Sequence, residues 1–109
     1  MKKVSIVSEI TAPRIGRAAS LAKLAGALSH EVRIKLLDLL KAHPRSCGTE
    51  LSQLLGMAHS IVFQHLKILR EAGIIDGVVI GKRVVYDINH KNLSLLKMIV
   101  SSIDSDVPT

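Results

Sequence analysis

The stretch SQLLGMAHSIV, residues 52–62, contains the spacing that decides the fold. Ser52 is small where a second helix would cross the first, and Gly56 tolerates the positive φ of a tight turn. Val62 then provides an apolar anchor for the second helix. Each feature is common alone, but together they predict two short helices, over 47–55 and 58–72, that cross at a steep angle. This is the pattern of a helix-turn-helix.

The second of these helices has two chemically different faces. At about 100° per residue, Val62, Leu66 and Leu69 fall on one stripe, which we expect to be buried. The opposite face carries side chains of the types that hydrogen-bond base edges or phosphates. The simpler alternative is that this face is an ordinary solvated helix surface with no DNA contact. Gln64 is the best candidate for reading a base, because its amide can bind adenine through two hydrogen bonds. The other candidate DNA contacts on this helix are His59, Ser60, Phe63, Lys67 and Arg70.

A β-hairpin is expected directly after this helix. Ile74–Ile80 and Val84–Ile88 are rich in β-branched residues, and Gly81-Lys82-Arg83 separates them. A basic hairpin beside a recognition helix suits flanking phosphates or a narrow minor groove, so Lys82 and Arg83 are predicted DNA contacts. Phe63 is expected either to pack against this hairpin or to touch a thymine methyl group.

The remaining segments complete a mainly α chain with a small hairpin (α+β), a winged helix-turn-helix of about five helices and a two-stranded wing. Residues 1–12 are expected to form an arm or short strand, and a first helix is expected to start at Thr11–Pro13. Ser29 and Ser46 are predicted helix caps, and a last helix is expected from Asn89 or His90. The domain is expected to span 13–103, followed by a polar tail, 104–109.

Composition narrows the class of protein. The chain has 109 residues, 48% hydrophobic but only 2% aromatic, so we expect one aliphatic core and an apolar subunit interface. A net charge of +6 favours a polyanionic partner, although a merely basic protein would show it too. We find no signal peptide, no membrane-spanning apolar run and no catalytic motif, which predicts a cytoplasmic protein that is not an enzyme.

Three stretches resemble the ArsR/SmtB family of repressors: ALSHEVRIKLL at 27–37, QHLKILREAGII at 64–75 and GKRVVY at 81–86. The resemblance covers about residues 20–103. Ala58 and Phe63 depart from it, because family members often carry serine at these places. The resemblance implies an inverted-repeat operator in double-stranded DNA, repression relieved by a ligand, and a homodimer joined through the first and last helices, here through Leu21, Leu24, Leu93, Leu96, Ile99 and Val100.

No sensing site is evident. Residues 50–56 lack the cysteine pair that the family often carries in this helix, and only His90 and Asp106 could ligate at the other common metal site. We therefore predict no metal or cofactor and cannot name an inducer. Cys47, near Arg45 at a helix start, suits either a redox switch or a small buried hydrophobe, and we favour the second. His65 is expected to be a packed, hydrogen-bonded core histidine.

These observations predict a sequence-specific DNA-binding transcriptional regulator, a repressor, that acts as a homodimer. The departures at Ala58 and Phe63 motivate an alternative. In that alternative the chain is a winged-helix module for protein or RNA interaction, without operator recognition.

Overall fold

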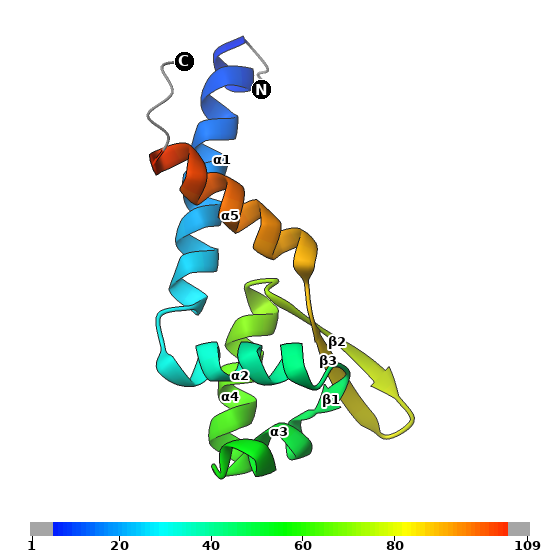
Figure 1. The fold of residues 1–109 in the computed structure, drawn as a ribbon. Helices are drawn as coiled ribbons and strands as arrows, with labels where there is room; N and C mark the ends of the chain where they lie inside the picture. Colours follow the sequence, from blue (N-terminus) through cyan, green and yellow to red (C-terminus); the bar gives the residue numbers. More distant parts are fainter. Residues whose placement is uncertain (1–5, 105–109) are drawn as a thin grey trace.

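The computed structural model describes the backbone of residues 6–104 and the side chains of residues 16–103. Helices α1 and α5 cross at one end of the molecule, and α2, α3 and α4 gather at the other end beside a small sheet (Figure 1). The predicted class, a winged helix-turn-helix, is confirmed. The elements in chain order are α1 Ile6–Ala27, α2 Glu31–Ala42, β1 Ser46–Cys47, α3 Gly48–Leu55, α4 His59–Glu71, β2 Ile75–Ile80, β3 Arg83–Ile88 and α5 His90–Asp104.

Helix α1 begins at Ile6, so the expected helix start at Thr11–Pro13 is wrong. Residues 6–12 form helical turns and not an arm or strand, while 1–5 lie outside the described residues. The expectation rested on alternation over three apolar residues, which is too short to separate a strand from a helix. Asp104 ends α5, and the rest of the expected tail also lies outside the described residues.

The sheet has a third strand that the sequence analysis did not predict. Its order is β1-β3-β2, fully antiparallel, with Ser46 opposite Tyr86 and Cys47 opposite Val85. Ser46 is therefore a strand residue and not the expected cap, and its Oγ donates to the carbonyl of His43 at 2.6 Å. A two-residue strand has no periodicity to detect, because pairing with β3 alone defines it.

The hairpin turn is shorter than expected. Ile80 pairs with Arg83, so Gly81 and Lys82 alone form the loop and Arg83 is the first residue of β3. Gly81 has φ +64°, as two-residue hairpin loops require. The ladder therefore fixes the direction of the Arg83 side chain, while Lys82 stays at the tip.

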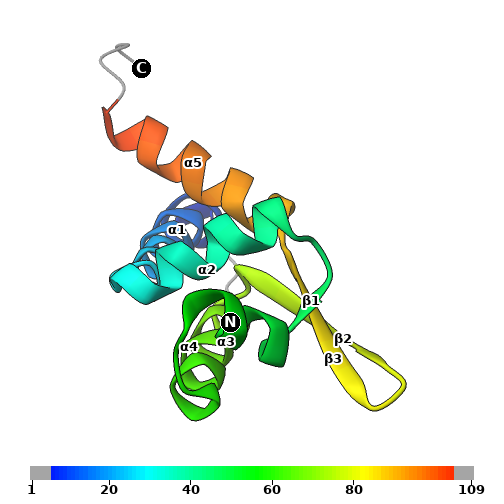
Figure 2. The same cartoon turned by 60° about the horizontal axis from the view of Figure 1, so that its bottom comes forward.

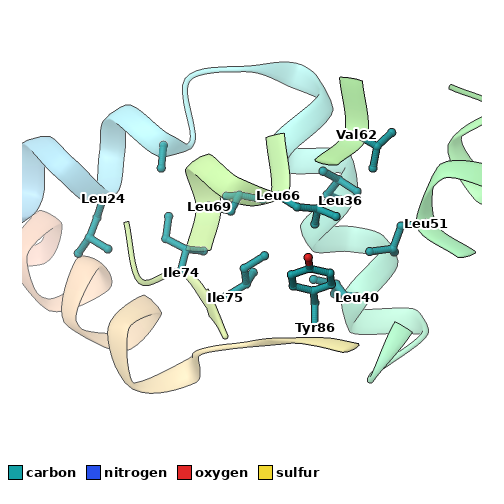
Figure 3. Packing of buried hydrophobic residues seen from close by; sticks show 11 residues of the cluster. Leu24, Leu36, Leu40, Leu51, Val62, Leu66, Leu69, Ile74, Ile75 and Tyr86 are labelled. Atoms are coloured by element: carbon teal, nitrogen blue, oxygen red, sulfur yellow. The ribbon is translucent and has the colours of Figure 1, made fainter. Parts of the chain in front are cut away.

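The core confirms the predicted crossing of α3 and α4. Ser52 is 1% exposed, so the two helices approach closely, and Gly56 turns the chain at φ +67°. Around this crossing lies an almost wholly aliphatic cluster with one aromatic member (Figure 3). Its buried members are Leu24, Ala27, Leu36, Leu40, Leu51, Val62, Leu66, Leu69, Ile74, Ile75 and Tyr86.

A buried arginine in α2 joins this helix to α1 and α4. Arg33 in α2 is 9% exposed, and its Nε donates to the carbonyl of Ala27 in α1 at 2.6 Å. Its Nη1 donates to Nδ1 of His65 in α4 at 3.1 Å, and the ring of His30 lies 4.4 Å from that of His65. His65 is thus packed and hydrogen-bonded, and it fixes α4 to the corner between α1 and α2. His30, not the expected Ser29, caps α2 by accepting from the N–H of Val32.

His65 should make the fold sensitive to acid. Burial, reinforced by the charges of His30 and Arg33, lowers its pKa below the ordinary value near 6.5. The neutral ring is the form that accepts from Arg33, so this interaction stabilises the fold above about pH 6.5. Its contribution is lost as the pH falls through the lowered folded-state pKa.

We therefore expect the free energy of unfolding to fall more steeply between pH 7 and pH 5 in the unaltered protein than in His65→Gln. Urea denaturation across this range measures the difference. His90→Gln, at an exposed position on α5, is the matched control and should follow the unaltered curve. Parallel curves for the unaltered protein and His65→Gln would contradict the role given to this contact.

Candidate nucleic-acid interface

Helix α4 has the two faces that its sequence predicted. Val62, Leu66 and Leu69 are at most 1% exposed and pack into the core. Ser60, Gln64 and Lys67 are exposed on the opposite side. A view from below shows α4 and α3 side by side, with the β2–β3 hairpin extending away from them (Figure 2). The helix is therefore held rigidly by one face while the polar face stays available.

Phe63 packs on the start of α3. Its ring lies so close to Gly48 that a Cβ at that position would collide with it, so the glycine and the phenylalanine fit as a pair. The ring is 43% exposed, and the ring of His59 lies 6.2 Å away. The contact that the structure gives this ring is with Gly48 of α3, whereas the sequence analysis expected packing against the hairpin or contact with a thymine methyl group.

A cavity of about 580 Å³ lies between α3, α4 and the wing. One wall carries the basic residues Lys82 and Arg83, and another carries Phe63. The cavity therefore brings the two predicted contacts of the wing and one predicted contact of α4, Phe63, to one concave surface. Its lining consists of Cys47, Gly48, Thr49, Glu50, Phe63, Lys82, Arg83, Val84 and Tyr86.

A small polar network lies in this cavity. Glu50 Oε1 accepts from the backbone N–H of Cys47 at 2.8 Å and lies 3.2 Å from Nη2 of Arg83. The same Nη2 donates to Sγ of Cys47 at 3.2 Å. The bond from the Cys47 N–H, helped by Arg83, lowers the pKa of Glu50, and the contacts with Cys47 and Glu50 raise the pKa of Arg83. Glu50 is thus held ionised beside a cation.

Sequence reasoning missed this network. It placed Cys47 near Arg45, but the guanidinium beside the thiol belongs to Arg83, and the backbone N–H of Arg45 donates to Asp87. The cysteine is 8% exposed, as the preferred interpretation of a small buried residue expects. A glutamate three residues into α3 was the one available signal, because such residues often accept from the N-cap N–H.

Arg70 lies at the base of the wing. Its Cδ is 3.5 Å from the position that a Cβ on Gly77 would occupy, so the aliphatic stem crosses β2. The residue is exposed, as are Lys67 and Lys82. The predicted phosphate contacts therefore extend from α4 onto the hairpin.

The expected dimer residues divide into three groups. Leu24 and Ile99 are each 4% exposed within the single chain, and Leu24 belongs to the core cluster, so they are not available to a partner. Leu21, Leu93 and Leu96 are half-buried, and Val100 is 49% exposed. Helix α5 also exposes apolar side chains that the sequence analysis did not select, namely Leu95, Met98 and Ile103.

The sequence analysis considered two positions for a metal, His90 and Asp106. Within the part of the chain that the structure describes, no group of three or more His, Cys, Asp or Glu side chains could hold a metal ion. The amide of Asn92 instead donates to the carbonyl of Gly73 at 2.7 Å, which joins α5 to the end of α4. Asp106 lies outside the described residues.

Among the described helices, none has the length and apolar character to cross a membrane.

Comparison with known sequences finds regulators. The profile of the bacterial regulatory protein arsR family matches residues 30–76. The HTH-type transcriptional regulator YgaV of Escherichia coli K12 is 31% identical over 75 residues, which cover 69% of this chain and 76% of that protein. An uncharacterised HTH-type transcriptional regulator of Mycobacterium tuberculosis is 38% identical over 61 residues, covering 56% of this chain and 54% of the relative.

Solved structures show the same fold. An ArsR-like transcriptional regulator from Rhodococcus sp. RHA1 superposes with a TM-score of 0.74 at 25% identity, over 82% of this chain and 83% of that one. The transcriptional repressor PagR of Bacillus anthracis gives 0.64 at 26% identity, over 75% and 94%. A homodimeric winged helix-turn-helix DNA-binding domain from Mycobacterium bovis gives 0.65 at 21% identity, over 99% and 94%.

Three observations point to the same family: the buried stripe of α4, the basic two-residue loop of the hairpin, and these sequence matches. The chain belongs to the ArsR family of bacterial transcriptional regulators, which are DNA-binding winged helix-turn-helix proteins.

Proposed function

We propose that this regulator is a repressor that binds an inverted-repeat operator in double-stranded DNA as a homodimer. The observation that carries the proposal is the outer face of α4, where Ser60, Gln64 and Lys67 are exposed above a fully buried stripe. Side chains of these types, on a rigid helix beside a basic hairpin, suit the major groove. The transcriptional repressor PagR, which shares this fold, supports the direction of regulation.

The roles of the individual residues follow from their chemistry. Gln64 is proposed to read a base edge, with Ser60 beside it, while Lys67, Arg70 and His59 bind phosphates. Lys82 at the wing tip is proposed to contact flanking phosphate or the minor groove. A net charge of +6 per chain, twice that in a dimer, would speed the approach to DNA. Because bacterial DNA lies in the cytoplasm, we propose that the protein acts there.

The proposed dimer uses α5. Met98 and Ile103 are 68% and 69% exposed, and Leu95 and Val100 are exposed on the same helix. Four exposed apolar side chains on one short helix are unusual for a monomer surface and typical of a subunit interface. The homodimeric domain from Mycobacterium bovis supports this assembly.

The second candidate function is a winged-helix module for protein or RNA interaction that has lost operator recognition. The packing of Phe63 on Gly48 favours it, because this side chain of α4 then stabilises the start of α3. The two candidates differ in their response to DNA. A regulator binds its own promoter far more tightly than random duplex DNA, and both affinities fall steeply with salt.

Gln64→Ala should relax the base preference at one position of the operator and cost about 1–3 kcal/mol of binding free energy. Binding to a set of operator variants, with every base pair substituted in turn, measures this. Lys67→Ala is the control and should weaken all variants alike. An unchanged operator preference in Gln64→Ala would contradict the assignment of Gln64 to a base.

Lys82→Ala should weaken binding to all sequences alike and lower the slope of log affinity against log salt by about one unit, as expected for one lost phosphate contact. Binding isotherms over a salt series measure the slope. Lys91→Ala, at an exposed position on α5, is the control and should leave the slope nearly unchanged. An unaltered slope in Lys82→Ala would remove the wing tip from the interface.

Sedimentation at micromolar concentration should give a mass of twice 11.8 kDa. Met98→Asp, which places a charge in the proposed apolar interface, should shift the protein towards the monomer by tenfold or more in dissociation constant. Val79→Asp is the matched control, because Val79 is an equally exposed apolar residue on the wing. A monomer for the unaltered chain, or a dimer insensitive to Met98→Asp, would rule out this interface.

A further inference from the structure

Besides the pairing of β3 with β1, the side chain of Arg83 links the wing to the helix-turn-helix. Nη2 of Arg83, on β3, lies 3.2 Å from the carboxylate of Glu50 in α3 and 3.2 Å from Sγ of Cys47. Glu50 in turn accepts from the N–H of Cys47, where β1 gives way to α3. Arg83 is thus held between two other elements and does not extend from the hairpin tip as Lys82 does.

Glu50 is an unfavourable residue at a DNA-binding surface. Its carboxylate lines the cavity between α3, α4 and the wing, beside Thr49 and Lys82, where the proposed function would place the DNA backbone. A carboxylate near phosphates repels them, and this repulsion grows where the site excludes water. The guanidinium of Arg83 cancels that charge locally.

We propose that Arg83 is a positioning residue that holds the wing against α3 and neutralises Glu50, and that it does not itself contact DNA phosphate. The phosphate contact of the wing then falls to Lys82. This inference rests on the proposed function and changes the role expected of Arg83 from the sequence alone.

Direct phosphate binding by Arg83 is the competing role. The ion pair with Glu50 is half-exposed, and a pair of this kind changes the folding equilibrium constant by no more than about fivefold. A nearby DNA phosphate could therefore replace Glu50 as the partner of the guanidinium. The two roles differ in one respect. A positioning and neutralising residue matters only while Glu50 is charged, whereas a phosphate contact matters whether or not Glu50 is charged.

A charge-matched double variant separates the two roles. Arg83→Gln lowers the net charge from +6 to +5, Glu50→Gln raises it to +7, and the double variant returns it to +6 (6 − 1 + 1). Affinity for a duplex carrying the promoter of the protein's own gene is measured for all four proteins over a salt series. Arg83→Gln alone should weaken binding by about three- to tenfold.

In the Glu50→Gln background, the same Arg83→Gln change should cost less than about twofold, and the salt slope should equal that of the unaltered protein. Lys82→Gln is the control, and its cost should be the same in both backgrounds. An equal loss for Arg83→Gln in both backgrounds, with the slope of the double variant lower by about one unit, would overturn the proposal.

Amide hydrogen exchange of the free protein tests the positioning role without DNA. Cys47 and Val85 face each other across β1 and β3, next to the network. The exchange of Val85 should speed up about two- to fivefold in Arg83→Gln and Glu50→Gln, but not in Lys82→Gln. The N–H of Cys47 donates to Glu50 itself, so its exchange is compared only between Arg83→Gln and Lys82→Gln. Unchanged exchange in both network variants would show that Arg83 holds nothing in place. If the unaltered protein binds no duplex, the proposed function fails, while this measurement still decides the positioning role.

Discussion

The crossing of α3 and α4 at Ser52 is the contact on which the rest of the molecule depends. Because Ser52 is fully buried and Gly56 adopts a left-handed conformation, the two helices meet over a short turn and Val62 enters the core. That anchor fixes the rotation of α4 about its own axis. The outer face of α4 is polar and exposed as a consequence, and any larger residue at position 52 would move it.

Two polar networks extend this arrangement to the rest of the chain. Arg33 ties α4, through His65, to the end of α1, and the Cys47–Glu50–Arg83 network ties α3 to the wing. The amide of Asn92 joins α5 to the end of α4. Helix α4 and its C-terminal end are thus connected by hydrogen bonds to α1 and to α5, the helix of the proposed dimer interface.

The features predictable from the sequence were those set by periodicity or by a backbone requirement. The stripe of Val62, Leu66 and Leu69 and the turn at Gly56 depend on local spacing, and the structure confirms both. Strand β1, the pairing of Gly48 with Phe63 and the partners of Arg83 depend on residues distant along the chain, which a single sequence does not show. The burial of Leu24 and Ile99 within one chain has the same cause, because an apolar helix face is equally suited to a core or to a partner.

The outer face of α4 is proposed to read a symmetric DNA site, and selection of bound duplexes from a random pool, followed by sequencing, tests this. We expect an enriched inverted repeat whose half-sites lie about one helical turn, roughly 10 base pairs, or a multiple of it apart. A pool that stays random after several rounds at low salt would show that α4 does not read a symmetric site, and it would favour the interaction module.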